Sequence, residues 1–309
     1  MRQPRGYGYF VRRAPLGGRH LYWNSKRYSK HIAAAARTYF LLTLTLALSG
    51  CVQGLFYHPD HIQYDTPKRA GLRFEPVSFP STDGTQLSGW FIPAAGISDP
   101  RNAKGTVIHF HGNAQNLSAH WRYVEWLPKR GFNLFVFDYR GYGTSGGSPD
   151  VKSVFEDSNS ALNYIRSRPD VNPDKLVVIG QSLGGANAIA AVGSGNKAGV
   201  KAVVIEAAFY SYSSIASDKI SWAGIFMNDT FSPDRYIADI SPIPFLLLHG
   251  TADQIIPFHH AIKLFNKAGE PKRLFVIEGG RHVEAFSPRF GVAYMDLVSD
   301  FIEAALSTK

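Results

Sequence analysis

One stretch of this chain reads Lys175-Leu-Val-Val-Ile-Gly-Gln-Ser-Leu-Gly-Gly-Ala-Asn-Ala-Ile-Ala190. Its beginning is a mostly apolar run, as in a buried strand, and its end is rich in small residues that suit a helix. Between them, Ser182 lies on a sharp turn flanked by Gly180 and Gly184, where a side chain would strike the neighbouring strand or helix. The pattern therefore predicts a strand, a tight turn and a helix, with the serine hydroxyl held clear of both, as in a nucleophile elbow.

The net charge of +9 comes entirely from the N-terminal part of the chain. Residues 1–50 contain nine of the 33 Lys and Arg residues and no acidic residue, which leaves 24 basic against 24 acidic residues in the remainder. A polyanion-binding protein would carry its basic surplus on the folded domain itself, so we expect no nucleic-acid partner. The length of 309 residues fits one α/β domain of about 250 residues.

Residues 1–50 have the composition of a signal or targeting segment. The apolar run 39–48 is too short to span a bilayer comfortably. It ends in Leu48-Ser49-Gly50-Cys51, which resembles the lipobox of bacterial lipoproteins, in which signal peptidase cuts before a cysteine that carries the lipid. Cys51 is the only cysteine, so no intrachain disulfide and no cysteine-based metal site can form. An uncleaved membrane-tethering helix with an incidental cysteine is the alternative.

The residue after Cys51 bears on localisation. It is Val52 and not an aspartate, and in Gram-negative sorting signals this resemblance points to the outer membrane. We therefore expect a lipid-anchored protein of the bacterial cell envelope that faces the periplasm. Residues 51–73 are then a linker, and residues 74–309 form the folded domain.

Strand-like and helix-like segments alternate from about residue 74, and most of the strands are continuous apolar runs, which indicates a sheet buried on both faces. The sequence predicts an α/β fold with a doubly wound, mostly parallel eight-stranded sheet. Asp83-Gly84 predicts a tight hairpin between the first two strands, so that pair is antiparallel. The predicted strands are 74–80, 87–93, 106–111, 132–139, 175–180, 200–205, 245–249 and 273–277, and the predicted helices lie near 117–128, 153–167, 183–193, 259–268 and 292–306.

Residues 207–243 interrupt this alternation between the sixth and seventh strands. They are rich in aromatic and large apolar residues without a strand pattern, and we interpret them as a small helical lid. Inserts at the carboxyl ends of strands lie over the substrate site, where aromatic side chains can line an apolar acyl pocket. For any single one of these side chains, packing of the lid onto the domain is an equal alternative.

A serine hydroxyl is a poor nucleophile at neutral pH, so it needs a histidine base and a carboxylate that orients the histidine. Asp253 follows the seventh predicted strand, and His282 follows the eighth. The carboxyl ends of parallel strands share one edge of the sheet, so Ser182, Asp253 and His282 can converge there.

The region from about Phe56 to Ile302 resembles α/β-hydrolase-fold serine hydrolases with a compact lid. The order Ser, Asp, His is the order of that fold. Further segments that match the family pattern are His109-Phe-His-Gly-Asn-Ala114, Asp138-Tyr-Arg-Gly-Tyr-Gly-Thr-Ser-Gly146 and the loops at Asp253 and His282.

The resemblance implies a role for each matched residue. Ser182 attacks an acyl carbon, His282 takes and returns the proton, and Asp253 orients His282. The backbone amides of Asn113 and Leu183 bind the oxyanion. These two positions match the family pattern because Asn113 follows the His-Gly pair and Leu183 follows the nucleophile.

Other residues compete for these roles. Glu206, at the end of the sixth predicted strand, is the rival acid, since some members of the fold place the carboxylate there. We expect His109, His111 and His249 to make local hydrogen bonds. We expect His259-His260 to lie on the surface, without the further ligands that a metal site needs. Gly141-Tyr-Gly143 lacks the spacing of a dinucleotide loop, so neither a metal nor a cofactor is implied.

The predicted function is that of a serine hydrolase that cleaves carboxylic esters or thioesters through an acyl-enzyme. The expected partners are a small-molecule or lipid acyl substrate and, through the N-terminal anchor, the membrane. An apolar lid favours acyl esters over peptides. A serine peptidase and a non-catalytic envelope lipoprotein on a hydrolase scaffold are the alternatives, because the fold does not choose among them. Haloperoxidase-like or dehalogenase-like chemistry is a further possibility, although a dehalogenase uses a carboxylate at the turn.

Overall fold

The computed structural model describes residue 37 and residues 56–308. The chain divides into two compact units, Met1–Leu46 and Ala47–Lys309, and the fold described here belongs to the second. Apart from residue 37, the predicted signal segment 1–50 lies outside the described residues, as does the lipidation site Cys51. Among the described residues, the structure contains no helix with the length and hydropathy needed to cross a membrane.

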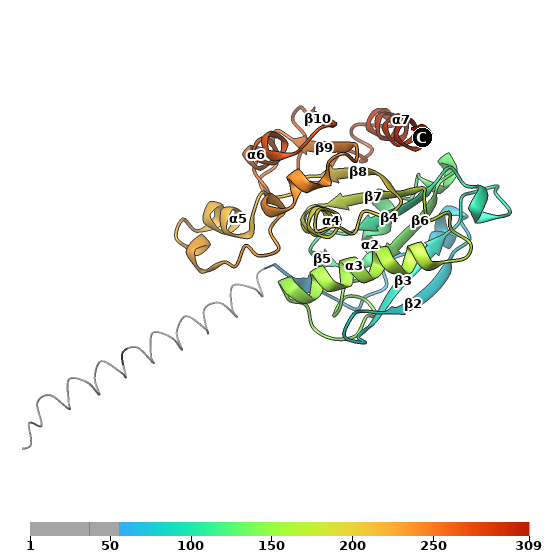
Figure 1. Cartoon of the computed structure of the whole chain (residues 1–309), viewed down its shortest axis with the longest axis horizontal. Coiled ribbons are helices and arrows are strands. Elements are labelled where there is room, and N and C mark those ends of the chain that lie inside the picture. The colour runs from blue at the N-terminus through green and yellow to red at the C-terminus, as the bar shows by residue number, and fades with distance from the viewer. Residues whose placement is uncertain (1–36, 38–55, 309) are drawn as a thin grey trace, which may run out of the picture. The chain divides into compact units, whose positions relative to one another are not determined.

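The domain is built on one eight-stranded sheet with the strand order β10-β9-β8-β7-β4-β6-β3-β2 (Figure 1). Neighbours from β10 to β6 pair in parallel, whereas β3 is antiparallel to both β6 and β2. This confirms the predicted α/β architecture and the antiparallel first hairpin. The strands are β2 (Glu75–Pro80), β3 (Gln86–Ile92), β4 (Thr106–Phe110), β6 (Asn133–Phe137), β7 (Leu176–Gln181), β8 (Val200–Glu206), β9 (Phe245–Gly250) and β10 (Lys272–Ile277).

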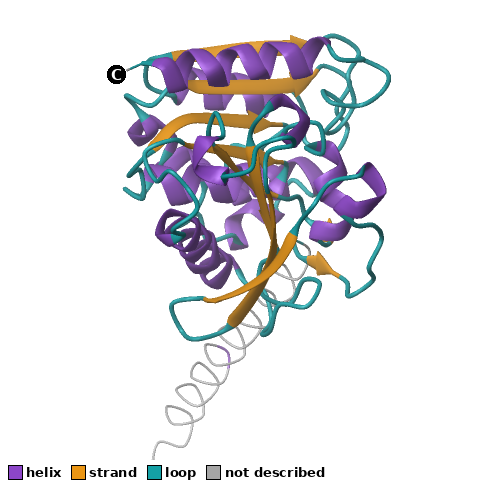
Figure 2. Ribbon diagram, turned by 90° about the vertical axis from the view of Figure 1, so that its right-hand side faces the viewer, coloured by secondary structure: helices purple, strands orange, loops and turns teal. Residues whose placement is uncertain are grey.

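Strands β4, β6, β7 and β9 are buried along their whole length because helices cover both faces of the sheet (Figure 2). Side chains of α3 (Val151–Ser167), α4 (Leu183–Gly193) and α6 (His259–Lys267) share one buried cluster with one face. Side chains of α7 (Ala293–Ser307) and of the segment around Trp121 pack on the other face. Burying residues on both faces removes the alternation that a half-exposed strand would show.

The predicted helix near 117–128 was wrong in its extent. The structure has a short helix α2 (Leu117–His120), followed by the 3₁₀ turns η3 (Trp121–Tyr123) and η4 (Pro128–Arg130). Pro128 occupies the first position of η4, where the missing N–H costs nothing, but in a longer helix the same ring would remove a hydrogen bond.

A small parallel pair, β1 (His58–Pro59) with β5 (Ala114–Gln115), was not predicted. It lies outside the main sheet and joins the beginning of the described domain to the loop after β4. Two-residue strands have no periodicity to detect, so only the tertiary pairing defines them.

The segment 207–243, predicted as a helical lid, contains one α-helix and three 3₁₀ turns. These are α5 (Tyr212–Lys219), η5 (Ala223–Phe226), η6 (Pro233–Arg235) and η7 (Ile237–Ile240). Phe209 and Tyr212 are buried in the core, whereas Trp222 and Ile225 are 57% and 79% exposed. Some of the aromatic and apolar residues of this segment therefore pack into the core, and others are exposed to solvent.

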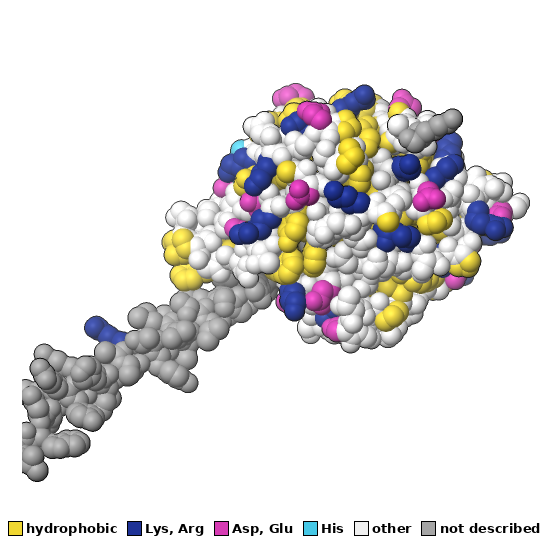
Figure 3. All heavy atoms as spheres, in the orientation of Figure 1, with side chains coloured by type: hydrophobic (Ala, Val, Ile, Leu, Met, Phe, Trp, Pro, Cys, Tyr) yellow, Lys and Arg dark blue, Asp and Glu magenta, His cyan; other side chains and the backbone are white. Residues whose placement is uncertain are grey.

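Charged side chains of both signs are interspersed on the face of the domain drawn in Figure 3. This agrees with the equal numbers of basic and acidic residues after residue 50.

Candidate active site

Ser182 lies at the turn between β7 and α4, with a φ of 56° and a ψ of −123°. The two flanking glycines allow this turn. An added Cβ atom at Gly184 would lie 2.1 Å from the carbonyl oxygen of Phe110, and one at Gly180 would lie 2.7 Å from the Cα atom of Gly185. The Ser182 N–H donates to the carbonyl of Glu206 at 2.9 Å, which fixes the turn to the neighbouring strand β8. This is the strand–turn–helix geometry that the sequence predicts.

His282 joins Ser182 to Asp253. Its Nε2 atom lies 2.9 Å from Ser182 Oγ, and its Nδ1 atom lies 2.8 Å from Asp253 Oδ2. A carboxylate can only accept, so Nδ1 carries the proton and Nε2 is free to accept the serine hydroxyl proton. The structure thus brings together three of the predicted site residues from separate loops at the carboxyl edge of the sheet.

Asp253 is fully enclosed, with no exposed side-chain surface. Its Oδ1 atom accepts the backbone N–H groups of Ile255 and Ile256, each at 2.9 Å. Burial raises the pKa of Asp253, but hydrogen bonds from His249 and His282 outweigh it and hold that pKa well below its usual range. The carboxylate therefore stays ionised at neutral pH, as a group that orients and stabilises an imidazolium must.

Asn113 and Leu183 both line the cavity beside Ser182. Leu183 is the first residue of α4, where backbone N–H groups have no partner within the helix. In the described part of the chain, neither backbone N–H donates to a protein acceptor. The Asn113 loop is held in place because its side-chain oxygen accepts the N–H of His58 at 2.9 Å and its carbonyl accepts the Tyr142 hydroxyl at 2.6 Å. The role of the Asn113 and Leu183 N–H groups as an oxyanion hole stays a prediction.

A cavity of about 470 Å³ opens in front of Ser182. Its size falls in the range of small-molecule sites. Part of its wall comes from α5 of the lid, which contributes Ile215, Ala216 and Lys219. No Asp or Glu is among the described residues that line it, which are mostly apolar and include Phe56, Leu183, Phe209, Ile220 and Ile256. Such a site suits an uncharged apolar group next to the serine.

Comparison with known proteins shows the family to which this architecture belongs. A family model described as serine aminopeptidase, S33 matches residues 101–237. The uncharacterized protein YfhR of Salmonella typhi is 49% identical over 264 residues, which cover 82% of this chain and 89% of YfhR. The α/β-hydrolase domain-containing protein WAV2 of Arabidopsis thaliana is 30% identical over 239 residues, which cover 72% of this chain and 76% of WAV2. This chain belongs to the α/β-hydrolases.

The esterase Pf2001 of Pyrococcus furiosus has the same fold. It superposes with a TM-score of 0.66 and 21% identity, over 81% of this chain and 97% of the esterase. The fold expected from the resemblance is thereby confirmed.

Glu206 lies at the end of β8 but does not contact His282 through a hydrogen bond. It is 1% exposed, and its two carboxylate oxygens accept from the Ala285 N–H and from the Gln181 amide, each at 2.7 Å. Burial raises the pKa of Glu206, while these two donors oppose the rise. The geometry therefore supports Asp253, and not Glu206, as the partner of His282 in this hydrolase.

His111 and His249 make the expected local hydrogen bonds, whereas His109 on β4 bonds to Gln181 on the neighbouring strand β7, 72 positions away in the chain. Their ring nitrogens contact the side-chain oxygen of Gln181 and the carbonyl oxygens of Gly112 and Ile256. Burial lowers the pKa of His109 to about 3, so this imidazole is neutral at physiological pH.

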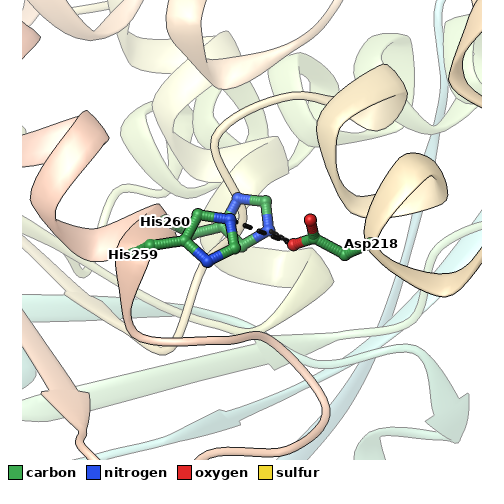
Figure 4. Close-up of side chains that lie close together, drawn as sticks. All are labelled: Asp218, His259 and His260. Atoms are coloured by element: carbon green, nitrogen blue, oxygen red, sulfur yellow. Dashed lines mark hydrogen bonds and ion pairs between the residues drawn. The ribbon is translucent and has the colours of Figure 1, made fainter. Parts of the chain in front are cut away.

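His259 and His260 meet Asp218 of the lid helix α5 (Figure 4). The expectation that both histidines lie on the surface was wrong for His260, whose side chain is fully buried, because the lid covers it. The Nε2 atoms of His259 and His260 lie 3.0 and 2.8 Å from Asp218 Oδ2. Only the tertiary structure brings Asp218 here, from about forty residues away in the chain.

The tautomer of His260 argues against a metal ion at this cluster. Its Nδ1 atom accepts the backbone N–H of Tyr210 at 3.0 Å, so the ring proton is on Nε2, which donates to Asp218. A protonated Nε2 cannot bind a metal, and moving the proton to Nδ1 would set it against the Tyr210 N–H. The cluster is therefore an attachment between the lid and α6.

Proposed function

We propose that this α/β-hydrolase cleaves carboxylic esters or thioesters through an acyl-enzyme formed on Ser182. The observation that carries the proposal is the continuous set of contacts from Asp253 through His282 to Ser182, at the wall of an apolar cavity.

The acylation step follows from this geometry. Ser182 Oγ attacks the acyl carbon while its proton passes to Nε2 of His282. The resulting imidazolium lies next to the ionised Asp253, and the developing oxyanion faces the N–H groups of Asn113 and Leu183. When the intermediate collapses, the bond to the leaving group breaks and His282 returns the proton to the leaving alcohol or thiol.

Deacylation repeats the sequence with water. His282 takes a proton from the attacking water, and the bond from the acyl carbon to Ser182 Oγ breaks as His282 returns the proton to the serine. The carboxylic acid then leaves the cavity, and the resting state is restored.

The second candidate is an aminopeptidase, which the description of the matching family model favours. An aminopeptidase must bind the ammonium group of its substrate, for which a carboxylate at the site is the ordinary partner. The described cavity lining has one lysine and no acidic residue, which favours esters.

Two measurements test the proposal. The purified protein should react with a fluorophosphonate probe, which separates a serine hydrolase from a non-catalytic binding protein. It should also hydrolyse p-nitrophenyl esters, with kcat/KM rising from acetate to octanoate as more methylenes are buried in the cavity. Hydrolysis of aminoacyl p-nitroanilides in preference to these esters would favour the aminopeptidase, and failure to react with the probe would refute both.

We also propose that Cys51 attaches the hydrolase to the envelope as a lipoprotein, at the outer membrane and facing the periplasm. Support comes from the Leu48-Ser49-Gly50-Cys51 sequence and from the basic surplus that is confined to residues 1–50. A lipid anchor would hold the hydrolase near lipid acyl substrates, which an apolar cavity suits.

A further inference from the structure

A buried chain of hydrogen bonds lies behind the serine turn. The imidazole Nε2–H of His109 on β4 donates to the side-chain oxygen of Gln181 on β7 at 2.9 Å. The Gln181 amide then donates to Glu206 on β8 at 2.7 Å. All three side chains are at most 1% exposed, so these bonds do not compete with water. Gln181 is the residue immediately before Ser182, so this chain holds the nucleophile from its strand side.

The second carboxylate oxygen of Glu206 reaches the loop that carries His282. It accepts the backbone N–H of Ala285 at 2.7 Å. Ala285 itself is completely buried. The Glu206 side chain therefore connects Gln181, the residue before the nucleophile, to Ala285, just after the base. Strands β9 and β10 lie between Glu206 and Ala285 in the chain.

Backbone strain is concentrated next to this connection. Ser182, Ala207 and Val283 have φ values of 56°, 55° and 52°. They follow Gln181, Glu206 and His282 directly in the chain. Positive φ is unfavourable for residues other than glycine, and most of all for a β-branched residue such as Val283. Residues in such conformations persist where the surrounding contacts over-determine them.

We propose that Glu206 is a positioning residue that holds the His282 loop at a set distance from the Ser182 turn. The proposal rests on the proposed function, because it concerns the alignment of the same serine and histidine. The Glu206 side chain makes its hydrogen bonds to Gln181 and Ala285 and makes none to Ser182 Oγ or to the ring of His282. It acts through the Ala285 N–H, which keeps the strained Val283 conformation and with it the direction of the imidazole.

Two substitutions of Glu206 distinguish a role of its two acceptor oxygens from a role of its charge. Glu206→Leu keeps the bulk of the side chain and removes both acceptors, so kcat should fall about 10²-fold with little change in KM, the loss expected when a reacting group shifts by about 1 Å. Glu206→Gln keeps an acceptor for Ala285. The new amide N–H of the variant can donate to the side-chain oxygen of Gln181 if the Gln181 amide turns over. The Gln181 NH₂ group then donates to Nε2 of His109, whose proton moves to Nδ1. That Nδ1 atom has no partner among the described residues. We expect Glu206→Gln to stay within about fivefold of wild type, since every link in the chain can be remade.

Hydrogen exchange gives a readout that does not depend on turnover. The Ala285 amide should be strongly protected in wild type and in Glu206→Gln, and it should exchange much faster in Glu206→Leu. Circular dichroism and thermal melting establish that each variant is folded. Asp157→Asn is the matched control, because Asp157 is also a fully buried carboxylate, bound to Arg140 away from the site. It should lower the melting temperature without changing kcat.

The outcomes decide between the two proposals. Wild-type kcat or unchanged Ala285 protection in folded Glu206→Leu would overturn the positioning role. A loss in Glu206→Gln as large as that in Glu206→Leu would also overturn it, because the carboxylate charge would then matter and not the two acceptors. A wild-type protein without hydrolase activity would refute the proposed function instead, and the exchange of Ala285 would still test the contact.

Discussion

The Nε2 atom of His282 lies 2.9 Å from the Oγ atom of Ser182, although 100 positions separate the two residues in the chain. The contact forms because β7 and β10 are parallel members of one sheet, so the loops that follow them leave from the same edge. Strands β8 and β9 lie between them, and the loop after β10 must therefore extend across two strands to reach the serine.

Ser182→Ala should abolish ester hydrolysis and fluorophosphonate labelling while the melting temperature stays close to that of wild type. Loss of a triad nucleophile costs on the order of 10⁴-fold or more in rate, and this hydroxyl contributes little to packing. Steady-state kinetics on a p-nitrophenyl ester and thermal melting measure the two effects. Retention of more than a small fraction of wild-type turnover would show that another residue is the nucleophile.

Asp253→Asn should lower kcat by about 10⁴-fold, because an amide at this position favours the wrong tautomer of His282. Glu206→Gln should cost far less, since Glu206 makes no hydrogen bond to His282 and its variant can remake its contacts. The two variants match in chemistry and can be compared in one assay after folding is checked. The reverse ranking would assign the orienting carboxylate to β8.

Asp218→Asn should raise KM for octanoate esters several-fold and leave acetate esters nearly unchanged. Asp218 attaches α5 to His259 and His260, and its neighbours Ala216, Lys219 and Ile220 form part of the cavity wall. A single hydrogen bond contributes about 1 kcal/mol to stability, which sets the modest size of the effect. Asp239→Asn, which removes an exposed carboxylate of the same segment, is the control. Equal KM changes for both esters would argue against a role for this attachment in the acyl pocket.

The free energy of unfolding should fall as the pH is lowered from about 6.5 to about 4. Burial lowers the pKa of His109 and His120 to about 3 and that of His260 to about 4. The unfolded chain binds protons at these residues below about pH 6.5, whereas the folded protein does not until pH 3–4. Stability therefore rises with pH across this window, by about 1.4 kcal/mol per pH unit for each fully shifted residue.

Urea unfolding at several pH values measures this slope. His109→Gln should reduce the proton uptake on unfolding by about one proton, because it removes one of the three groups. A free energy of unfolding that is constant between pH 6.5 and 5 would contradict the buried neutral state of these histidines.

Cys51→Ser should block lipid labelling in cells and leave an unprocessed precursor, whereas the wild type should fractionate with membranes. The reason is that signal peptidase cleavage of this class of precursor requires the lipid-modified cysteine. Ser182→Ala should be processed like wild type, which makes it the control for this experiment. Full-length wild-type protein in the cytosol with an unlabelled Cys51 would contradict the anchor and leave the hydrolase proposal unchanged.

Local sequence patterns were sufficient to predict the sheet and to select the candidate residues Ser182, Asp253 and His282. Mostly apolar runs predicted the eight strands, because a strand buried on both faces carries few polar residues. Ser182 was found from the glycines at positions 180 and 184, which the sharp turn requires. Asp253 and His282 followed from their places after predicted strands. Each of these signals lies within a few residues of the feature that it predicts.

The remaining features depend on contacts between residues that are distant in the chain. The burial of His260, its link to Asp218 and the bond from Glu206 to the Ala285 N–H have no local pattern. The sequence by itself determined the strands, the turn and the types of the reacting groups, since these depend on periodicity and on backbone sterics. Only the tertiary structure decided which carboxylate meets His282 and which one supports its loop, because a side chain's partners depend on which strands become neighbours and how far their loops reach.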